Sequence, residues 1–91
     1  MKLRDGFSKE IVFTDHAKAR MKKRGATEEE VKKAISKSTW QSSKLGRFEC
    51  SLEFSFNKEW NEKFYRLKQV VPVFVEEKSQ IVVITVYVFY F

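Results

Sequence analysis

The 91-residue chain contains one cysteine, one proline, three glycines and one histidine. The lone Cys50 has no second cysteine for a disulfide within the chain, and no histidine stands at a metal-ligand spacing from it. We therefore expect Cys50 to be a buried strand residue and expect neither a metal site nor a cofactor. The most apolar segment, residues 81–91, is too short and too β-branched for a membrane-spanning helix, so no membrane partner is expected.

The N-terminal ten residues are charged and no apolar run follows them. This pattern predicts that there is no secretory signal and that the protein is cytoplasmic. The apolar fraction of 43%, with nine Phe, three Tyr and two Trp, supplies material for a core. A chain of this length builds one compact core, so a single domain over residues 1–91 is predicted.

The net charge of +6 is distributed unevenly. Residues 1–37 hold eleven Lys/Arg and six Asp/Glu, a net +5, whereas residues 38–91 hold seven and six, a net +1. The positive charge therefore lies in the first half of the chain. This distribution is typical of a surface that binds a polyanion, and equally of a solvated lysine-rich surface.

Two helices are predicted in the basic half. The first runs from about residue 15 to Arg24 and ends at Gly25, because glycine adopts the left-handed conformation of a helix C-terminus at little cost. Thr27 and Glu30 form a capping box that begins a second helix. The buried stripe of that helix is predicted to be Val31, Ala34 and Ile35.

Strand patterns dominate the second half and also precede the first helix. Residues 11–13 are an apolar β-prone triplet, and residues 48–56 alternate between apolar and polar, as in a strand with one wet face. Residues 63–68 and 70–75 are β-prone, with an edge, bulge or bend expected at Pro72.

The remaining segments are predicted to connect these elements. Residues 36–47 are a polar connector with Trp40 as a packing anchor, residues 57–61 are a loop, and residues 76–80 are a turn. The last strand, residues 81–91, is apolar on both faces, which predicts that helices cover one face and a dimer or other partner covers the second. The predicted fold class is α+β, with two N-terminal helices packed on an antiparallel sheet of three to four strands.

Three residues of the first helix could carry chemistry. His16, Arg20 and Arg24 follow one another at intervals of four, so they lie within roughly 80° of each other around the helix axis. Imidazole transfers protons near neutral pH, and guanidinium groups bind phosphate oxygens. RNA is the favoured substrate for such a metal-free site because its 2′-hydroxyl supplies the nucleophile.

The same three residues also have a structural interpretation. A single histidine near a helix N-terminus is often a surface or capping residue. Arg20 and Arg24 could pair with glutamates of the sheet, and the candidates are Glu49, Glu53, Glu76 and Glu77.

The stretch from Phe13 to Val31, FTDHAKARMKKRGATEEEV, closely resembles the opening signature of the domain-of-unknown-function 4258 family, roughly F-T-x-H-A-x-x-R-M-x-x-R-G-I-S/T-x-E-E-V. Residues 81–87 resemble the family's closing strand more weakly. Ala26 replaces the usual isoleucine and leaves the polar positions intact.

The resemblance implies a fold like that of RelE-type and BrnT-type toxins and, through it, a role as a toxin–antitoxin ribonuclease. His16, Arg20 and Arg24 carry over as catalytic candidates. Thr85 and Tyr87 are weaker candidates in the final strand, with cross-strand packing as their alternative role, and Tyr87 could also stack on a base. Lys68 and Arg66 are further cationic candidates that no motif supports.

Three functional hypotheses follow. In the first, the protein is a metal-independent endoribonuclease in which His16 acts as general acid or base, Arg20 and Arg24 hold phosphate, and Tyr87 or Lys68 assists. In the second, it is a non-catalytic module that binds RNA or protein through the same basic stripe. In the third, the signature is purely structural. The expected partners are RNA, an antitoxin protein and a second copy of the chain bound through the C-terminal strand.

Overall fold

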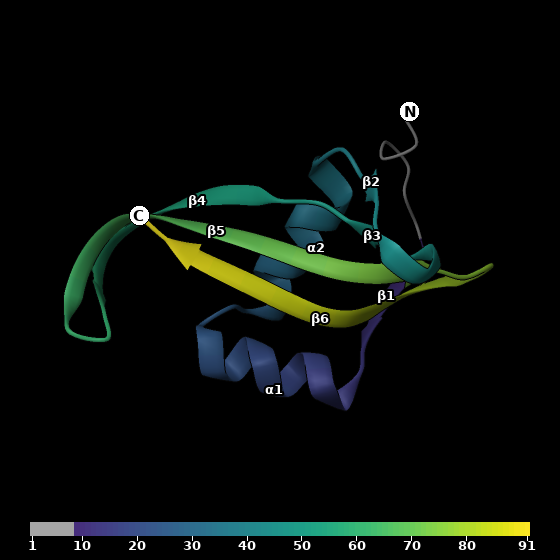
Figure 1. The fold of residues 1–91 in the computed structure, drawn as a ribbon, viewed down its shortest axis with the longest axis horizontal. Helices are drawn as coiled ribbons and strands as arrows, with labels where there is room; N and C mark the ends of the chain where they lie inside the picture. Colours follow the sequence, from purple (N-terminus) through teal and green to yellow (C-terminus); the bar gives the residue numbers. More distant parts are fainter. Residues whose placement is uncertain (1–8) are drawn as a thin grey trace.

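The computed structural model describes residues 9–91 (Figure 1). Its elements, in chain order, are β1 (Glu10–Phe13), α1 (Asp15–Arg24), α2 (Glu28–Lys37), β2 (Gln41–Ser42), the 3₁₀ turn η2 (Lys44–Gly46), β3 (Phe48–Glu49), β4 (Leu52–Trp60), β5 (Lys63–Glu76) and β6 (Gln80–Tyr90). The fold class is α+β, as the sequence predicts. Most of the segment on which the secretory-signal prediction depends lies outside the described residues. Within residues 9–91, neither helix has the length and apolarity needed to cross a bilayer.

Helix α1 begins and ends where the sequence predicts, and α2 begins at the predicted capping box but continues to Lys37, two residues into the predicted connector. The Thr14 hydroxyl caps α1 by accepting a hydrogen bond from the Ala17 N–H, and Gly25 ends the helix in the left-handed region with φ 86°. At the start of α2, Glu30 N–H donates to the Thr27 hydroxyl at 3.1 Å while Thr27 N–H donates to Glu30 Oε1 at 3.0 Å. The capping box is therefore complete, and one turn separates the helices.

The described strands form a six-stranded mixed sheet, so the prediction of three to four antiparallel strands was wrong in number and in direction. The strand order is β1-β6-β5-β3-β2, and β4 also pairs with β5. β1 runs parallel to β6, from Glu10 opposite Gln80 to Phe13 opposite Val83. One extra strand, β2, lies in the predicted connector and has two residues, too few to give a periodic signal. The other, β3, is the first part of the strand predicted over residues 48–56.

The region predicted as one strand over residues 48–56 is interrupted at Cys50 and Ser51. Cys50 N–H donates to the Pro72 carbonyl of β5 at 3.4 Å. Pro72 has no N–H with which to complete the ladder, so pairing breaks there and resumes at Leu52 opposite Val70. The predicted irregularity at Pro72 thus appears in the neighbouring strand, and β5 continues through the proline.

The prediction of a loop over residues 57–61 was wrong, because β4 continues to Trp60. Asn57 adopts φ 50° within a register shift between Ser55 and Lys58, and the chain reverses at Asn61 and Glu62, which also have positive φ. Between Ser55 and Lys58, β4 has one residue more than β5, and the additional residue forms a β-bulge. Asparagine adopts positive φ more readily than most residues do. The β4–β5 hairpin consequently projects beyond the sheet and carries Trp60 at its end (Figure 1).

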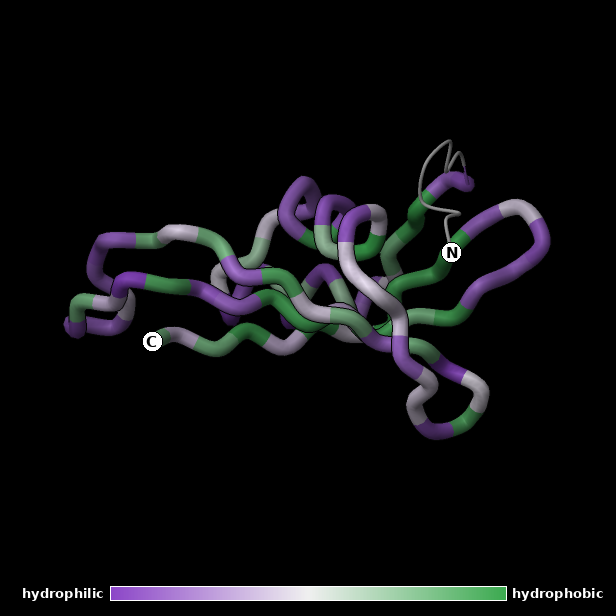
Figure 2. Tube along the Cα trace, turned by 90° about the horizontal axis from the view of Figure 1, so that it is seen from above, coloured by the Kyte–Doolittle hydropathy of each residue, from purple (hydrophilic) through white to green (hydrophobic). Residues whose placement is uncertain are grey.

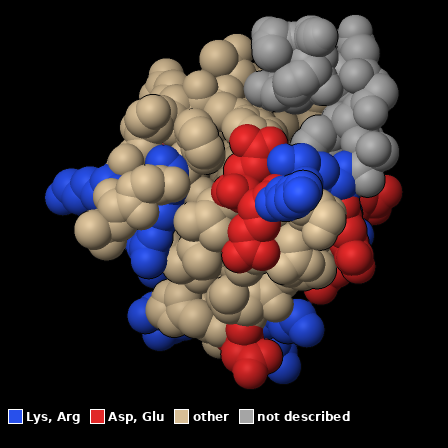
Figure 3. All heavy atoms as spheres, turned by 90° about the vertical axis from the view of Figure 1, so that its right-hand side faces the viewer, with Lys and Arg blue, Asp and Glu red and all other residues tan. Residues whose placement is uncertain are grey.

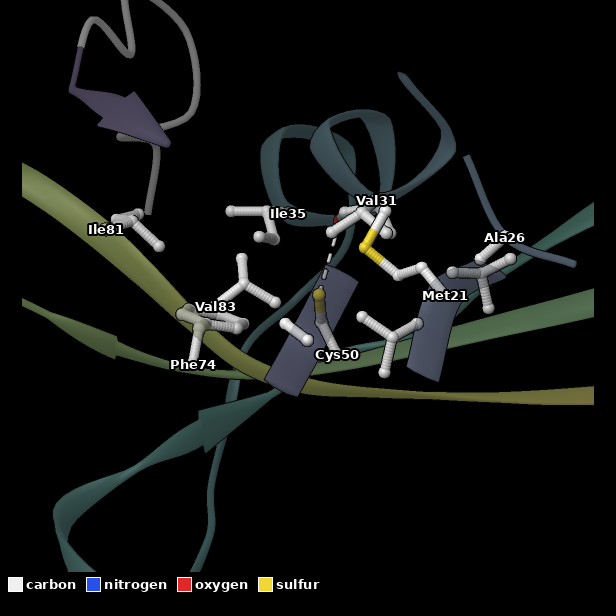
Figure 4. Packing of buried hydrophobic residues seen from close by; sticks show 12 residues of the cluster. Met21, Ala26, Val31, Ile35, Cys50, Phe74, Ile81 and Val83 are labelled. Carbon is white, nitrogen blue, oxygen red and sulfur yellow. Dashed lines mark hydrogen bonds between the residues drawn. The ribbon is translucent and has the colours of Figure 1, made fainter. Parts of the chain in front are cut away.

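The core lies between the helices and the sheet (Figure 4). The predicted stripe of α2 is fully buried, and Phe74 of β5 is also fully buried beneath it. Trp40 is the packing anchor that the sequence predicts: its indole N–H donates to the Ile35 carbonyl at 2.8 Å, and its ring meets Phe74 edge-on at 4.9 Å. Cys50 is buried, and its thiol donates to the Ala34 carbonyl.

The helices lie on one side of the sheet, and the loop that contains η2 lies on the other (Figure 2). A bulge at Ile84 shifts the alternation of β6, because Val73 pairs with Thr85 and Phe74 pairs with Val83. After this bulge the even-numbered residues of β6 face the helices and the odd-numbered residues face the second side, which we call the open face. Beyond Val83, β1 no longer pairs with β6, and α1 lies along that edge (Figure 1).

Candidate nucleic-acid interface

A groove of about 300 Å³ lies between the C-terminal half of α1, the tip of the β4–β5 hairpin and the end of β6. Three of the side chains that line it are the cations Arg20, Lys23 and Arg24, and none is acidic. The full lining is Arg20, Lys23, Arg24, Trp60, Asn61, Val88 and Tyr90. We call this feature the cationic groove. It contains two of the three residues in the predicted helical stripe.

Arg24 lies at the margin of the sheet and is held there by two contacts. Its Nη1 donates to the Val86 carbonyl of β6 at 2.8 Å. Its guanidinium carbon lies 5.1 Å from the centroid of the Tyr87 ring, within the range of a cation–π interaction. Val86 and Tyr87 face opposite sides of the sheet, so Arg24 spans the free edge of β6 and reaches from the cationic groove toward the open face.

The C-terminal end of α1 is tied to the sheet through its last carbonyl groups. The Tyr90 hydroxyl donates to the Arg24 carbonyl at 2.7 Å, and the Lys68 ammonium donates to the Gly25 carbonyl at 2.6 Å. A helix leaves these carbonyls without partners inside the helix, and positive charge near them is favourable. Side chains from β5 and β6 therefore complete the end of α1 and fix its position above the sheet.

The sequence analysis offered Lys68 as a nucleic-acid contact, whereas the structure buries it. Its side chain is buried, its Nζ lies 2.9 Å from Glu30 Oε1, and its ammonium lies 5.5 Å from the centroid of the Phe56 ring. Glu30 is the same carboxylate that closes the capping box of α2. Lys68 therefore joins β5 to the α1–α2 turn and presents no charge to solvent for an incoming phosphate.

An aromatic wall supports the far side of the cationic groove. The Tyr90 and Trp60 rings stack with centroids 5.2 Å apart and an interplanar angle of 19°. Phe56 and Tyr65 contact the Tyr90 ring at 5.1 and 5.5 Å. Burial, with a smaller contribution from the Glu30 carboxylate, raises the pKa of Tyr90 above its ordinary value, so the hydroxyl stays protonated and keeps its hydrogen bond to Arg24.

The other predicted site residues do not line the cationic groove. His16 is exposed on α1, one helical turn before Arg20, and such a pair of positions brings Cβ atoms to about 5–6 Å. Thr85 and Tyr87 line a separate hollow on the open face, together with residues of the η2 loop such as Arg47. Arg66 is exposed. Arg24 contacts both regions, because it lines the groove and its guanidinium lies over the Tyr87 ring.

The arginines of α1 do not pair with the glutamates that the structural interpretation named. Within residues 9–91 the ion pairs are Lys9 with Glu76 and Lys68 with Glu30. The end of the molecule at the β5–β6 turn shows acidic and basic side chains side by side (Figure 3). The cationic groove, at the opposite end, has basic side chains without acidic neighbours in its lining.

Five lining residues were missed by sequence reasoning: Lys23, Trp60, Asn61, Val88 and Tyr90. Lys23 could have been found, because it follows Arg20 by three positions and so lies on the same side of α1. Trp60 and Asn61 gave no such signal. They reach the groove only because the β4–β5 hairpin extends past the sheet, a long-range arrangement that local periodicity does not encode.

No group of three or more His, Cys, Asp or Glu residues suited to a metal ion occurs within residues 9–91. Comparison of the chain with models of protein families, with curated proteins and with solved structures gave no match in any of the three. The resemblance to the domain-of-unknown-function 4258 family therefore stays a prediction.

The turn at Gly25 offers a direct test of how α1 is docked. A Cβ at this position would lie 2.5 Å from the Tyr90 hydroxyl and 2.8 Å from the Trp60 ring, whereas a Cβ at Gly46, which also has positive φ, would meet nothing within 4 Å. Gly46→Ala should cost about 1 kcal/mol from backbone strain alone. Gly25→Ala should cost about 1–3 kcal/mol more in urea denaturation, because side chains must move. Equal losses for the two variants would show that α1 is not packed closely on Tyr90 and Trp60.

Proposed function

We propose that this protein binds unpaired RNA through the cationic groove. The observation that carries the proposal is the lining itself, in which Arg20, Lys23 and Arg24 meet an aromatic side chain, Trp60, with no acidic residue among them. Phosphates are attracted to clustered cations, and bases stack on aromatic rings. A groove with both features suits a nucleotide chain better than it suits an inorganic anion or an apolar ligand.

The three cations have different tasks in this proposal. The Arg24 guanidinium is committed to Val86 and Tyr87, which fixes its position and leaves fewer of its donors for a ligand. Arg20 and Lys23 make neither of the two described ion pairs, so they are the principal phosphate contacts. Arg20 is half-buried in the groove lining, and Lys23 is exposed.

The groove suits a single strand better than a duplex. Its volume of about 300 Å³ lies at the small end of the range of ligand sites and accommodates one nucleotide with its neighbouring phosphates. Stacking on Trp60 requires a base that has left a helical stack, which is available in loops and single strands.

Loss of either principal cation should weaken RNA binding. Arg20→Ala and Lys23→Ala should each reduce affinity about 3- to 10-fold at moderate salt, and each should lower the salt-dependence slope by about 0.7 for a single strand. Fluorescence anisotropy with a labelled single-stranded RNA of mixed sequence measures both effects. Lys18→Ala is the matched control, because Lys18 is an exposed cation of the same helix outside the groove lining. An equal loss in the control would mean that the net charge attracts RNA and that the groove does not.

Metal-independent RNA cleavage is the second candidate function. It is favoured by the position of His16, which is exposed one turn from Arg20 and thus close to the phosphate that Arg20 would bind. In this mechanism the imidazole removes the proton from the 2′-hydroxyl and the oxygen attacks the adjacent phosphorus to form a 2′,3′-cyclic phosphate. The bond from phosphorus to the 5′-oxygen breaks, and that oxygen takes a proton from water. Arg20 stabilises the charge that accumulates on the phosphorane.

His16→Ala separates cleavage from binding. The variant should retain RNA affinity within a factor of about two, since His16 does not line the groove, and should lose about 100-fold or more in cleavage rate. Denaturing gel electrophoresis of the labelled RNA, incubated with a chelator, measures the rate. If wild-type protein binds the RNA without cutting it, the protein is a binding module. If the variant cuts as fast as wild type, His16 has no part in the reaction.

A toxin–antitoxin role is the biological form of the second candidate. It is supported by the resemblance of the FTDHAKARMKKRG stretch to a family with RelE-like and BrnT-like relatives. Such a ribonuclease would act in the cytoplasm and be restrained by an antitoxin protein. A small acidic reading frame adjoining the gene would agree with this role.

A further inference from the structure

The open face of the sheet carries a row of exposed aromatic side chains near the C-terminus. Tyr87 is 45% exposed, Phe89 is 49% exposed and Phe91 is 58% exposed. On the neighbouring strand Leu67 is 38% exposed, and its carbonyl accepts a hydrogen bond from the Phe91 N–H. We call these four residues the aromatic row. Neither described helix covers them, because both helices pack on the core side of the sheet.

We propose that the aromatic row is the interface of a homodimer and that its occupant is the same surface of a second copy of the chain. The proposal does not depend on RNA binding. An aromatic residue offers roughly 150–250 Å² of surface, so the four residues of the row expose on the order of 400 Å². A standard interface buries about 800 Å² from each partner, about two-thirds of it apolar at homodimer contacts. The row supplies most of that apolar share.

The charges around the aromatic row favour a protein over RNA. Around the row, Glu49 and Glu53 are acidic, while Lys44 and Arg47 of the η2 region are basic. The Arg24 guanidinium also contacts the Tyr87 ring, so charges of both signs border the row, in contrast to the purely cationic charges of the groove lining. A border with both signs allows salt bridges between copies, whereas an RNA backbone would meet repulsion from the two glutamates.

The distribution of charge favours a second copy as the partner. Residues 38–91, which contain the open face, hold a net +1, and the larger share of positive charge belongs to residues 1–37. Two chains that meet through their open faces keep the basic helices on the outer sides of the dimer. The same arrangement leaves both cationic grooves accessible, since Val88 and Tyr90 line the groove from the other side of β6.

Sedimentation equilibrium over a range of protein concentrations tests the proposal. Wild type should form dimers, and Phe89→Glu should weaken dimerisation about 30-fold or more, as loss of a central aromatic anchor does. Ser79→Glu is the matched control, because it introduces the same charge at an exposed position in the β5–β6 turn, and it should dimerise like wild type.

Thermal unfolding at a concentration where every variant is monomeric shows whether Phe89→Glu is folded. If it is not, Phe89→Ser serves in its place, because it removes the exposed ring without adding a charge. A wild type that is monomeric at high concentration would overturn the proposal, as would a dimer that survives both substitutions. RNA anisotropy measured on the same samples reports groove function separately, so failure of the dimer would leave the proposed RNA site untouched.

Discussion

The attachment of the C-terminal end of α1 to the sheet is the contact on which the rest of the molecule depends. Tyr90 and Lys68 donate to the carbonyls of Arg24 and Gly25, two consecutive residues of the chain. Lys68 is buried, and a buried ammonium is costly without partners, so the carbonyl and the Glu30 carboxylate are required for its charge. The same contacts bring Arg20, Lys23 and Arg24 to the edge of β6, where the cationic groove forms.

This attachment also separates two surfaces with different chemistry. On the helix side, cations and Trp60 border a small groove that suits phosphate and base. On the open side, exposed rings are bordered by charges of both signs, which suits a protein surface. Arg24 crosses the free edge of β6 between the two, bound to the backbone of Val86 and to the ring of Tyr87.

The sequence predicted the elements whose signals are local. The bounds of α1 and the start of α2 follow from Thr14, Gly25 and the Thr27–Glu30 capping box, each of which acts within one helical turn. It did not predict the parallel pairing of β1 with β6, because that contact joins residues about seventy positions apart in the chain. It also predicted a loop over residues 57–61, because asparagine is favoured wherever φ is positive. That condition holds in a bulge, as at Asn57, and in a tight hairpin turn, as at Asn61, as well as in a loop.

The candidate site was predicted in part for the same reason. Arg20 and Arg24 share a helical stripe, and the structure brings both to one groove. Lys68 has no local feature that distinguishes a buried cation from a surface one, and its burial depends on Glu30 and Gly25 from the helical turn. Trp60 reaches the groove only because the β4–β5 hairpin is long. The alternating pattern in the sequence ends at Phe56 and so did not reveal that β4 continues to Trp60.

The most direct test of the central claim is an NMR titration of isotope-labelled protein with single-stranded RNA. Binding in the cationic groove predicts that the largest shift changes fall on the Arg20, Lys23 and Arg24 amides and on the indole N–H of Trp60. Changes centred on Tyr87 and Phe89, with the groove signals unmoved, would contradict that claim, and so would a spectrum that does not change at saturating RNA.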